Sequence, residues 1–357
     1  MQISEVIAVG VFCSYFSVIA GLFLLIAQSL SCQNCGGRAY VFIALAVTSF
    51  VHTWFCKSPI AFGDWSFTDY EQSARATIST GLTVEKMSQW LLNTSLFEQA
   101  WAHVCFGKVN WWWSQQLCLF TVGAWTIFLS VEGQRHHIKF IWAYMLLGQF
   151  VAISVASNLF YLALVLAPCP PSSSSSHGMS SLRAPVALWL PVLFSLGAIA
   201  TSPFTSEHSF LPNLLLMHTF IILPLLVPDC LFPPAQASVE TKSRFGISLK
   251  TLYIVVFGAA LVLHVRATGQ AAGDPPVSLR DLALKVWDVL HSHPAQSSMG
   301  WDVIWTSISF VVWLVLHPEL QPRVLPSGST IKGRFLTAMY LVMVTPLLSV
   351  GVLAPHV

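Results

Sequence analysis

The chain has 357 residues, of which 55% are hydrophobic and 9% are charged, whereas a soluble domain carries roughly 25% charged residues. This composition excludes an ordinary soluble globular protein and predicts an all-α, polytopic transmembrane helical bundle. The formal net charge of +2, without any basic cluster, argues against a nucleic-acid partner and leaves membrane lipid as the expected environment.

Apolar runs long enough to cross a bilayer recur along the chain, so we expect a single transmembrane domain over 1–357 with eight or nine spans. The first run, 6–27, is too long for the core of a signal peptide and lacks a basic start, which favours a retained span. The other expected spans are 40–56, 110–131, 138–166, 186–201, 210–227, 249–265, 300–316 and 335–353.

Two long connections separate these spans. The first is a polar loop at about 57–115, and its segment 84–106 has the mixed aromatic and charged pattern of an interfacial helix. The second, at about 168–185, contains five consecutive serines and is expected to be an exposed loop. A further short amphipathic helix is expected over 278–291.

Polar side chains within the expected spans are candidate pocket residues, because such groups need partners inside a membrane. Asn158 and Tyr161 share one helical face of the fourth span, which also contains Gln149. For both amides, hydrogen bonding between helices and pocket lining remain open interpretations. His52, in the second span, is equally open between a bond to a neighbouring helix and a functional role.

The end of the third span places a carboxylate beside aromatic rings. Trp125, Phe128 and Glu132 lie on one helical face. Glu132 is therefore a candidate proton donor, although Arg135 at i+3 could instead form an ordinary surface ion pair with it.

The run 300–316 has a carboxylate in its first turn. Asp302, Thr306, Ser309 and Trp313 fall in one row, at i, i+4, i+7 and i+11, while the other faces are mainly apolar. We expect this row to point into the bundle. An ionisable group near hydrocarbon is costly and suggests a function, but a first-turn carboxylate can also simply favour the helix dipole.

No sequence pattern indicates a metal or another cofactor, and we expect neither. The chain lacks GxxxxGK[ST], HExxH and GxSxG, and it has no DDxxD or DxDD run to hold the magnesium of a diphosphate-ionising prenyl enzyme. Its one CxxC pair, Cys32 and Cys35, lacks the second pair or histidines that metal sites usually have.

A few intramembrane carboxyls among many aromatic rings would suit acid-triggered carbocation chemistry. A carboxylic acid in apolar surroundings can stay protonated and donate its proton to an epoxide or alkene. Aromatic faces then stabilise the cation, by about 2 kcal/mol or more each when desolvated. Trp and Phe are also abundant in membrane belts and cores, so composition alone does not decide this.

Two stretches resemble fungal integral-membrane terpene cyclases of the ascochlorin- and paxilline-cluster type. The first lies within 131–164 and includes Glu132-Gly133-Gln134-Arg135-His136-His137, Trp142-Ala143-Tyr144-Met145-Leu146-Leu147-Gly148-Gln149 and Ser157-Asn158-Leu159-Phe160-Tyr161. The second is Gly300-Trp301-Asp302-Val303-Ile304-Trp305-Thr306-Ser307. The resemblance as a whole extends over about a third of the chain.

The resemblance implies metal-independent cyclisation of an often epoxidised farnesyl or geranylgeranyl chain on an aromatic or indole head, in meroterpenoid or indole-diterpene biosynthesis. Asp302, or less favourably Glu132, is then the proton donor. Cavity-lining rings would be Trp301, Trp305, Trp313, Trp125 and Phe128, while Arg135, Gln149 and Asn158 would orient the acid or the head group. Tyr161 and His52 are further substrate-binding candidates.

Two other classes stay open. A small-molecule transporter or receptor would use the inward polar residues as a passage or ligand site, but paired, interrupted spans in two similar halves are not evident. A non-catalytic membrane scaffold could gather other pathway enzymes. For all three classes we expect an integral membrane protein, located in the endoplasmic reticulum.

Overall fold

The computed structural model describes residues 3–30, 36–56, 59–73, 83–94, 96–167, 183–226, 246–316, 339, 345 and 349–354. Over these residues the protein is all-α apart from one two-residue antiparallel pairing, of β1 with β2. In chain order its elements are α1 (Ile3–Ser29), α2 (Gly37–Val51), the π-helix η1 (His52–Cys56), α3 (Pro59–Ser73), α4 (Thr83–Asn93), α5 (Leu96–Cys105), α6 (Lys108–Phe120), the π-helix η2 (Thr121–Trp125), α7 (Thr126–Arg135), α8 (Ile141–Phe150), α9 (Ile153–Leu166), β1 (Arg183–Ala184), α10 (Val186–Thr201), the 3₁₀-helix η4 (Ser202–Phe204), α11 (Glu207–Leu226), β2 (Ile247–Ser248), α13 (Leu249–Ala272), α14 (Leu279–Leu290), α15 (Pro294–Leu316) and α18 (Val350–Leu353).

The protein is a polytopic helical membrane protein. Within the described residues, six helices are long and apolar enough to cross a bilayer, rather than the eight or nine predicted. They are Ile3–Ser29, Lys108–Arg135, Val186–Phe204, Ser209–Leu226, Leu249–Ala272 and Pro294–Leu316.

The predicted number is wrong for identifiable reasons. The fourth expected span, 138–166, is broken between α8 and α9, and each half is shorter than a full crossing. The second, 40–56, forms α2 and η1, and its α-helical part has only 15 residues. Most of the last expected span, 335–353, lies outside the described residues.

The stretch 57–115 contains helices as well as connections. The interfacial segment expected over 84–106 is divided into α4 and α5, which are separated at Thr94. Most of the serine-rich loop at 168–185 lies outside the described residues, and its last part forms β1.

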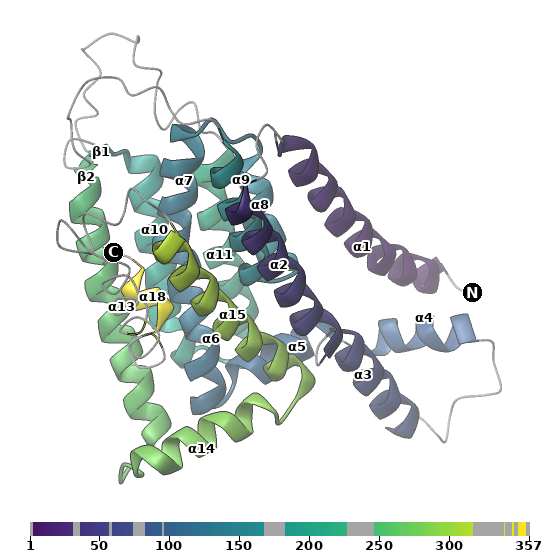
Figure 1. Ribbon diagram of the computed structural model, residues 1–357. Coiled ribbons are helices and arrows are strands. Elements are labelled where there is room, and N and C mark those ends of the chain that lie inside the picture. Colours follow the sequence, from purple (N-terminus) through teal and green to yellow (C-terminus); the bar gives the residue numbers. More distant parts are fainter. Residues whose placement is uncertain are drawn as a thin grey trace.

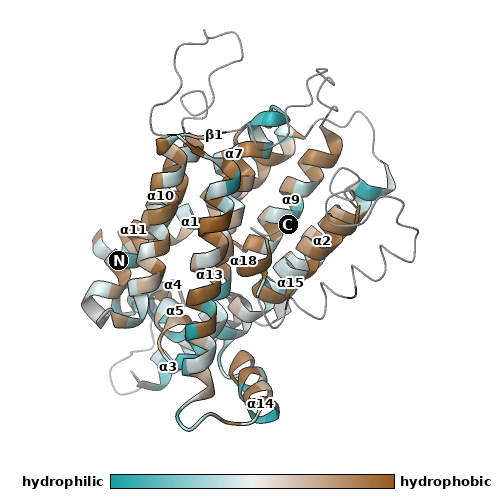
Figure 2. Ribbon diagram, turned by 90° about the vertical axis from the view of Figure 1, so that its left-hand side faces the viewer, coloured by the Kyte–Doolittle hydropathy of each residue, from teal (hydrophilic) through white to brown (hydrophobic). Residues whose placement is uncertain are grey.

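One of the six spans, made of α6, η2 and α7, is a largely buried central rod (Figure 1). It packs against α13, α15 and α18. Hydrophobic residues predominate along upright helices such as α2 and α10, and hydrophilic residues gather toward the two ends of the bundle (Figure 2). This distribution suits a bundle whose middle lies in hydrocarbon.

The expected amphipathic helix over 278–291 is confirmed as α14, which crosses one end of the bundle (Figure 1). Ser278 caps it by accepting a hydrogen bond from the backbone N–H of Asp281 at 3.2 Å. Gly300 allows α14 to approach α15 closely, because a Cβ at that position would lie 2.0 Å from Cδ1 of Leu290.

Helix α1 stands at the side of the bundle and is mostly exposed (Figure 1). It packs against α4 and α8 rather than against the central rod. Its exposed residues are mainly apolar, as expected for a span that faces lipid.

Candidate functional site

The break between α8 and α9 is the local feature around which the site is built. A helix leaves its last C=O groups and its first N–H groups without intrahelical partners, and these must be satisfied in an apolar interior. Two side chains from other elements bond the end of α8. The hydroxyl of Tyr15 donates to the carbonyl of Phe150 at 2.6 Å, and Nε1 of Trp54 donates to the carbonyl of Val151 at 3.2 Å.

Asp302 of α15 accepts hydrogen bonds from the N–H groups at the start of α9, on the other side of the break. Its Oδ2 accepts the N–H of Ile153 at 2.9 Å, and its Oδ1 accepts the N–H of Ser154 at 2.8 Å. The residue before α9, Ala152, has no side chain that could cap the helix. A carboxylate at this position is stabilised by both N–H groups and by the helix dipole.

The predicted orientation of the α15 row is confirmed. Asp302 is 7% exposed, and Thr306, Ser309 and Trp313 are buried as well. Thr306 Oγ1 lies 3.5 Å from Oδ1 of Asp302, at the outer limit for a hydrogen bond.

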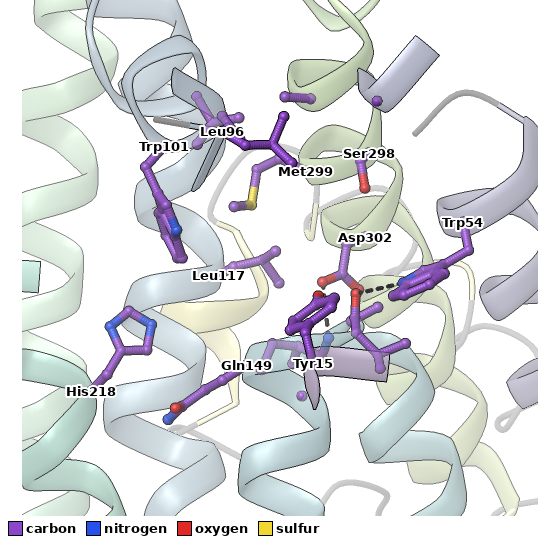
Figure 3. Close-up of a pocket in the computed structure, with 18 of the residues that line it drawn as sticks. Tyr15, Trp54, Leu96, Trp101, Leu117, Gln149, His218, Ser298, Met299 and Asp302 are labelled. Carbon is purple, nitrogen blue, oxygen red and sulfur yellow. Dashed lines mark hydrogen bonds between the residues drawn. The ribbon is translucent and has the colours of Figure 1, made fainter. Parts of the chain in front are cut away.

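Asp302, Tyr15 and Trp54 also line a cavity of about 620 Å³ (Figure 3). The cavity lies between α1, η1, the short helices α3 to α5 and α8, and the spans that contain α6, α11 and α15. Aromatic side chains form much of its wall: Phe12, Tyr15, Phe16, Trp54, Phe67, Trp90 and Trp101. The break in the α8–α9 helix therefore borders the hollow part of the molecule.

Two tryptophans of the wall donate their indole N–H groups to other residues of the protein. Trp54 bonds to Val151, and Nε1 of Trp90 donates to Oγ of Ser66 at 3.2 Å. Their rings are thereby fixed as apolar wall surfaces. Polar groups in the wall are few and include Asp302, Gln149 and His218.

Four of the predicted cavity residues lie elsewhere and fill a packed core. Tyr161 stacks on Trp313 with ring centroids 4.7 Å apart, and Phe128 makes edge contacts with both. Trp125 packs on Phe128 and Tyr161. None of these four is among the residues that line the cavity of Figure 3.

His52, Trp301 and Trp305 form a separate cluster that is also absent from the cavity wall. Nε1 of Trp305 donates to Nδ1 of His52 at 3.0 Å, and the ring of Trp301 lies 4.1 Å from that of His52. His52 therefore forms a hydrogen bond to a neighbouring helix, which is one of the two interpretations left open by the sequence.

Glu132 and Asn158 have partners outside the cavity. Glu132 pairs with Arg135 at 3.6 Å and lies 3.5 Å from Nε2 of His136, so the i+3 pair is present. Nδ2 of Asn158 donates to the carbonyl of Ser154 at 2.9 Å and to Oγ of Ser309 at 2.8 Å. Of the two amides, Gln149 lines the cavity and Asn158 joins α9 to α15.

Sequence reasoning missed most of the cavity wall. Phe12, Tyr15 and Phe16 were overlooked because the first span reads as a uniform lipid-facing helix, yet their i, i+3, i+4 spacing marks one face. His218 stands within the apolar run 210–227 and could have been found by asking why an ionisable group occurs there.

Among the residues that the structure describes, no group of three or more His, Cys, Asp or Glu side chains could hold a metal ion. The Cys32 and Cys35 pair lies outside the described residues. Comparisons with family models, curated proteins and solved structures find no match to this chain. The resemblance to fungal cyclases is therefore carried by the sequence stretches alone.

Proposed function

We propose that this protein is a membrane-bound terpene cyclase that closes rings in a lipophilic prenyl chain by proton-initiated, metal-independent chemistry. The observation that carries the proposal is the cavity itself. It is hollow, walled by aromatic rings, located between apolar helices, and bordered by one buried carboxyl group, that of Asp302.

The cavity suits a long apolar substrate. Its volume of about 620 Å³ falls within the range of about 300–1,000 Å³ that is usual for ligand pockets. Aromatic faces attract a carbocation without acting as nucleophiles, and an apolar wall limits quenching by water. The substrate class is a farnesyl or geranylgeranyl chain, commonly epoxidised, on an aromatic or indole head, as the resemblance implies.

Asp302 is the proton donor in this proposal. Its proton passes to the epoxide oxygen, the adjacent C–O bond breaks, and the alkene carbons attack the tertiary cation so formed. The departing proton leaves a carboxylate, and the N–H groups of Ile153 and Ser154 are already placed to stabilise that charge. A base or water removes the final proton from the cyclised cation, and Asp302 is protonated again from water.

The test is an assay on microsomes that contain this chain. Epoxyfarnesyl-phenol and epoxygeranylgeranyl-indole are incubated with EDTA, and products are followed by mass and NMR. A cyclised product that persists in EDTA is expected. It should disappear in both Asp302→Asn and Asp302→Ala, with a fall of at least about 10²-fold for loss of an acid catalyst.

A stability control is needed because Asp302 also caps α9. Thr306→Val changes the neighbouring hydroxyl and leaves both backbone bonds in place, so a folded Thr306→Val protein should retain activity. Glu132→Gln should also remain active, since Glu132 lies outside the cavity wall. Cyclisation by a folded Asp302→Ala protein would remove Asp302 from the mechanism.

A second candidate function rests on the broken α8–α9 helix. Helices interrupted beside a binding cavity are typical of secondary transporters. Energy-dependent uptake of the intact substrate into vesicles, without chemical change, would favour a transporter. In the cyclase proposal, the chain lies in the endoplasmic reticulum and its partners are the pathway enzymes that prenylate and epoxidise the substrate.

A further inference from the structure

His218 is a polar cavity residue to which the proposed reaction assigns no role. It lies on α11, one of the six candidate spans, and lines the same cavity as Asp302. An ionisable side chain at such a position is expected to have a use.

Hydrogen bonding fixes which ring nitrogen of His218 is free to accept. Nδ1 lies 2.8 Å from the carbonyl oxygen of Leu214, one turn earlier on α11. A carbonyl oxygen only accepts, so Nδ1 must carry the hydrogen. In the uncharged imidazole the other nitrogen, Nε2, is then an acceptor.

The ring is also held in place by its neighbour. Trp101 meets His218 edge to face, with centroids 5.6 Å apart and an interplanar angle of 76°. This contact and the bond to Leu214 restrain the imidazole at two points. An acceptor restrained in this way can select a ligand group by direction.

The polar residues of the cavity wall include His218, Gln149 and Asp302, together with Tyr15, Asp64, Thr121 and Ser298. Figure 3 shows His218 and Gln149 on one side of the cavity and Asp302 with Trp54 on the other. Nε2 of Gln149 is buried and has no hydrogen-bond partner among the described residues. In that view one side of the cavity offers an imidazole acceptor and an amide, and the other offers the buried carboxyl of Asp302.

We propose that Nε2 of His218 accepts a hydrogen bond from the O–H or N–H of the aromatic head group of a lipophilic ligand. The head group then lies against His218 and Gln149, and the apolar tail extends toward Asp302. This inference rests on the proposed function for its substrate class, and it adds which part of the substrate each side of the cavity binds.

The experiment measures binding without reaction. The purified full chain in lipid nanodiscs is titrated with a phenol that carries a saturated farnesyl chain, and separately with its O-methyl ether. The ether retains the shape and loses the donor. The wild-type protein is expected to bind the phenol about fivefold more tightly, as one neutral hydrogen bond allows.

Two variants remove Nε2 in different ways. His218→Phe retains a ring against Trp101, and His218→Leu retains apolar bulk without any hydrogen-bonding group. Both variants are expected to bind the phenol and the ether equally. One folded variant is enough to decide whether Nε2 of His218 accepts the hydrogen bond from the phenol. Thr219→Val is the matched control, because Thr219 is exposed and bonds the carbonyl of Leu215 on the same helix.

An unchanged preference for the phenol in a folded His218 variant would overturn the inference, and so would equal binding of phenol and ether by the wild type. A saturated chain has no alkene or epoxide to react, so this result is independent of cyclisation. Loss of preference without cyclase activity would refute the reaction and keep the binding role. Cyclase activity in the wild type, with an unchanged phenol preference in the His218 variants, would support the reaction and refute the binding role of His218.

Discussion

Two aromatic regions lie along α15, and one is filled while the other is hollow. The filled region holds Tyr161 and Trp313 in parallel contact at 4.7 Å, with Phe42 packed against both. The hollow region is bordered by Trp54 and Trp101. The same residue type thus forms a core in one place and a binding wall in the other.

The difference comes from the helices that surround each region. Around Tyr161, the helices α2, α9 and α15 pack side by side, so their rings meet one another. Around the cavity, α3, α4 and α5 are short, and the α8–α9 helix is broken. Short and interrupted helices cannot fill the space as densely, and the polar groups at their ends need outside partners.

The largest expected contrast is between one tryptophan of each region. Trp313→Ala should lower the free energy of unfolding by about 3–5 kcal/mol, because a buried ring leaves a cavity in a packed core. Trp101→Ala should cost less, since its ring already borders a hollow, and should instead weaken ligand binding. Denaturant unfolding in mixed micelles and a ligand titration check both. Equal losses of stability would contradict the distinction.

The two amides that look alike in sequence provide a second contrast. Asn158→Leu should cost about 1–2 kcal/mol, because it removes the bond to Ser309 that joins α9 to α15 and the bond to the Ser154 carbonyl within α9. Gln149→Leu should change stability by about 0.5 kcal/mol or less, since its buried Nε2 has no partner among the described residues. The same unfolding measurement applies. A larger loss in Gln149→Leu than in Asn158→Leu would refute the assignment.

A smaller effect is expected where the first span closes the cavity. Tyr15→Phe removes the bond to the Phe150 carbonyl and should cost about 0.5–1.5 kcal/mol. Because α1 is otherwise mostly exposed, the loss should be local, as faster amide hydrogen exchange in α1 and at the end of α8. Ser14→Ala is the control, since its hydroxyl bonds only within α1 to the carbonyl of Val11. Unaltered exchange in Tyr15→Phe would show that this contact does not hold α1.

The last contrast concerns acid, at the end of the bundle outside the spans. Burial, and secondarily the nearby His103, lower the pKa of His293 to about 4, and His103 stacks on it at 3.9 Å. Nδ1 of His293 accepts the N–H of Ala295 at 3.2 Å, which protonation would prevent. The unfolded chain, with a histidine pKa of about 6.5, therefore binds more protons than the folded one between pH 6.5 and 4.

Stability from this histidine is fully present above about pH 6.5 and declines as the pH falls toward 4. Thermal unfolding midpoints in buffered micelles should show the decline, and His293→Gln should reduce its slope. A slope that is the same in both proteins would assign the acid sensitivity to other groups.

Several features of this protein were determined by the sequence alone. Apolar runs with few charges fix a polytopic helical membrane protein, because backbone groups in hydrocarbon must be satisfied within helices. The 3.6-residue period placed the row from Asp302 to Trp313 toward the interior, and the structure confirms this. The amphipathic pattern of 278–291 likewise predicted α14.

Other features were decided only by tertiary structure. Neither residue of the break, Val151 or Ala152, is a proline or a glycine, and the break is stabilised by Tyr15, Trp54 and Asp302 from distant parts of the chain. The same distant packing determines whether an aromatic ring meets another ring or borders a hollow. Sequence periodicity gives the face on which a residue lies, but the distance to the neighbouring helix depends on how all the helices pack together.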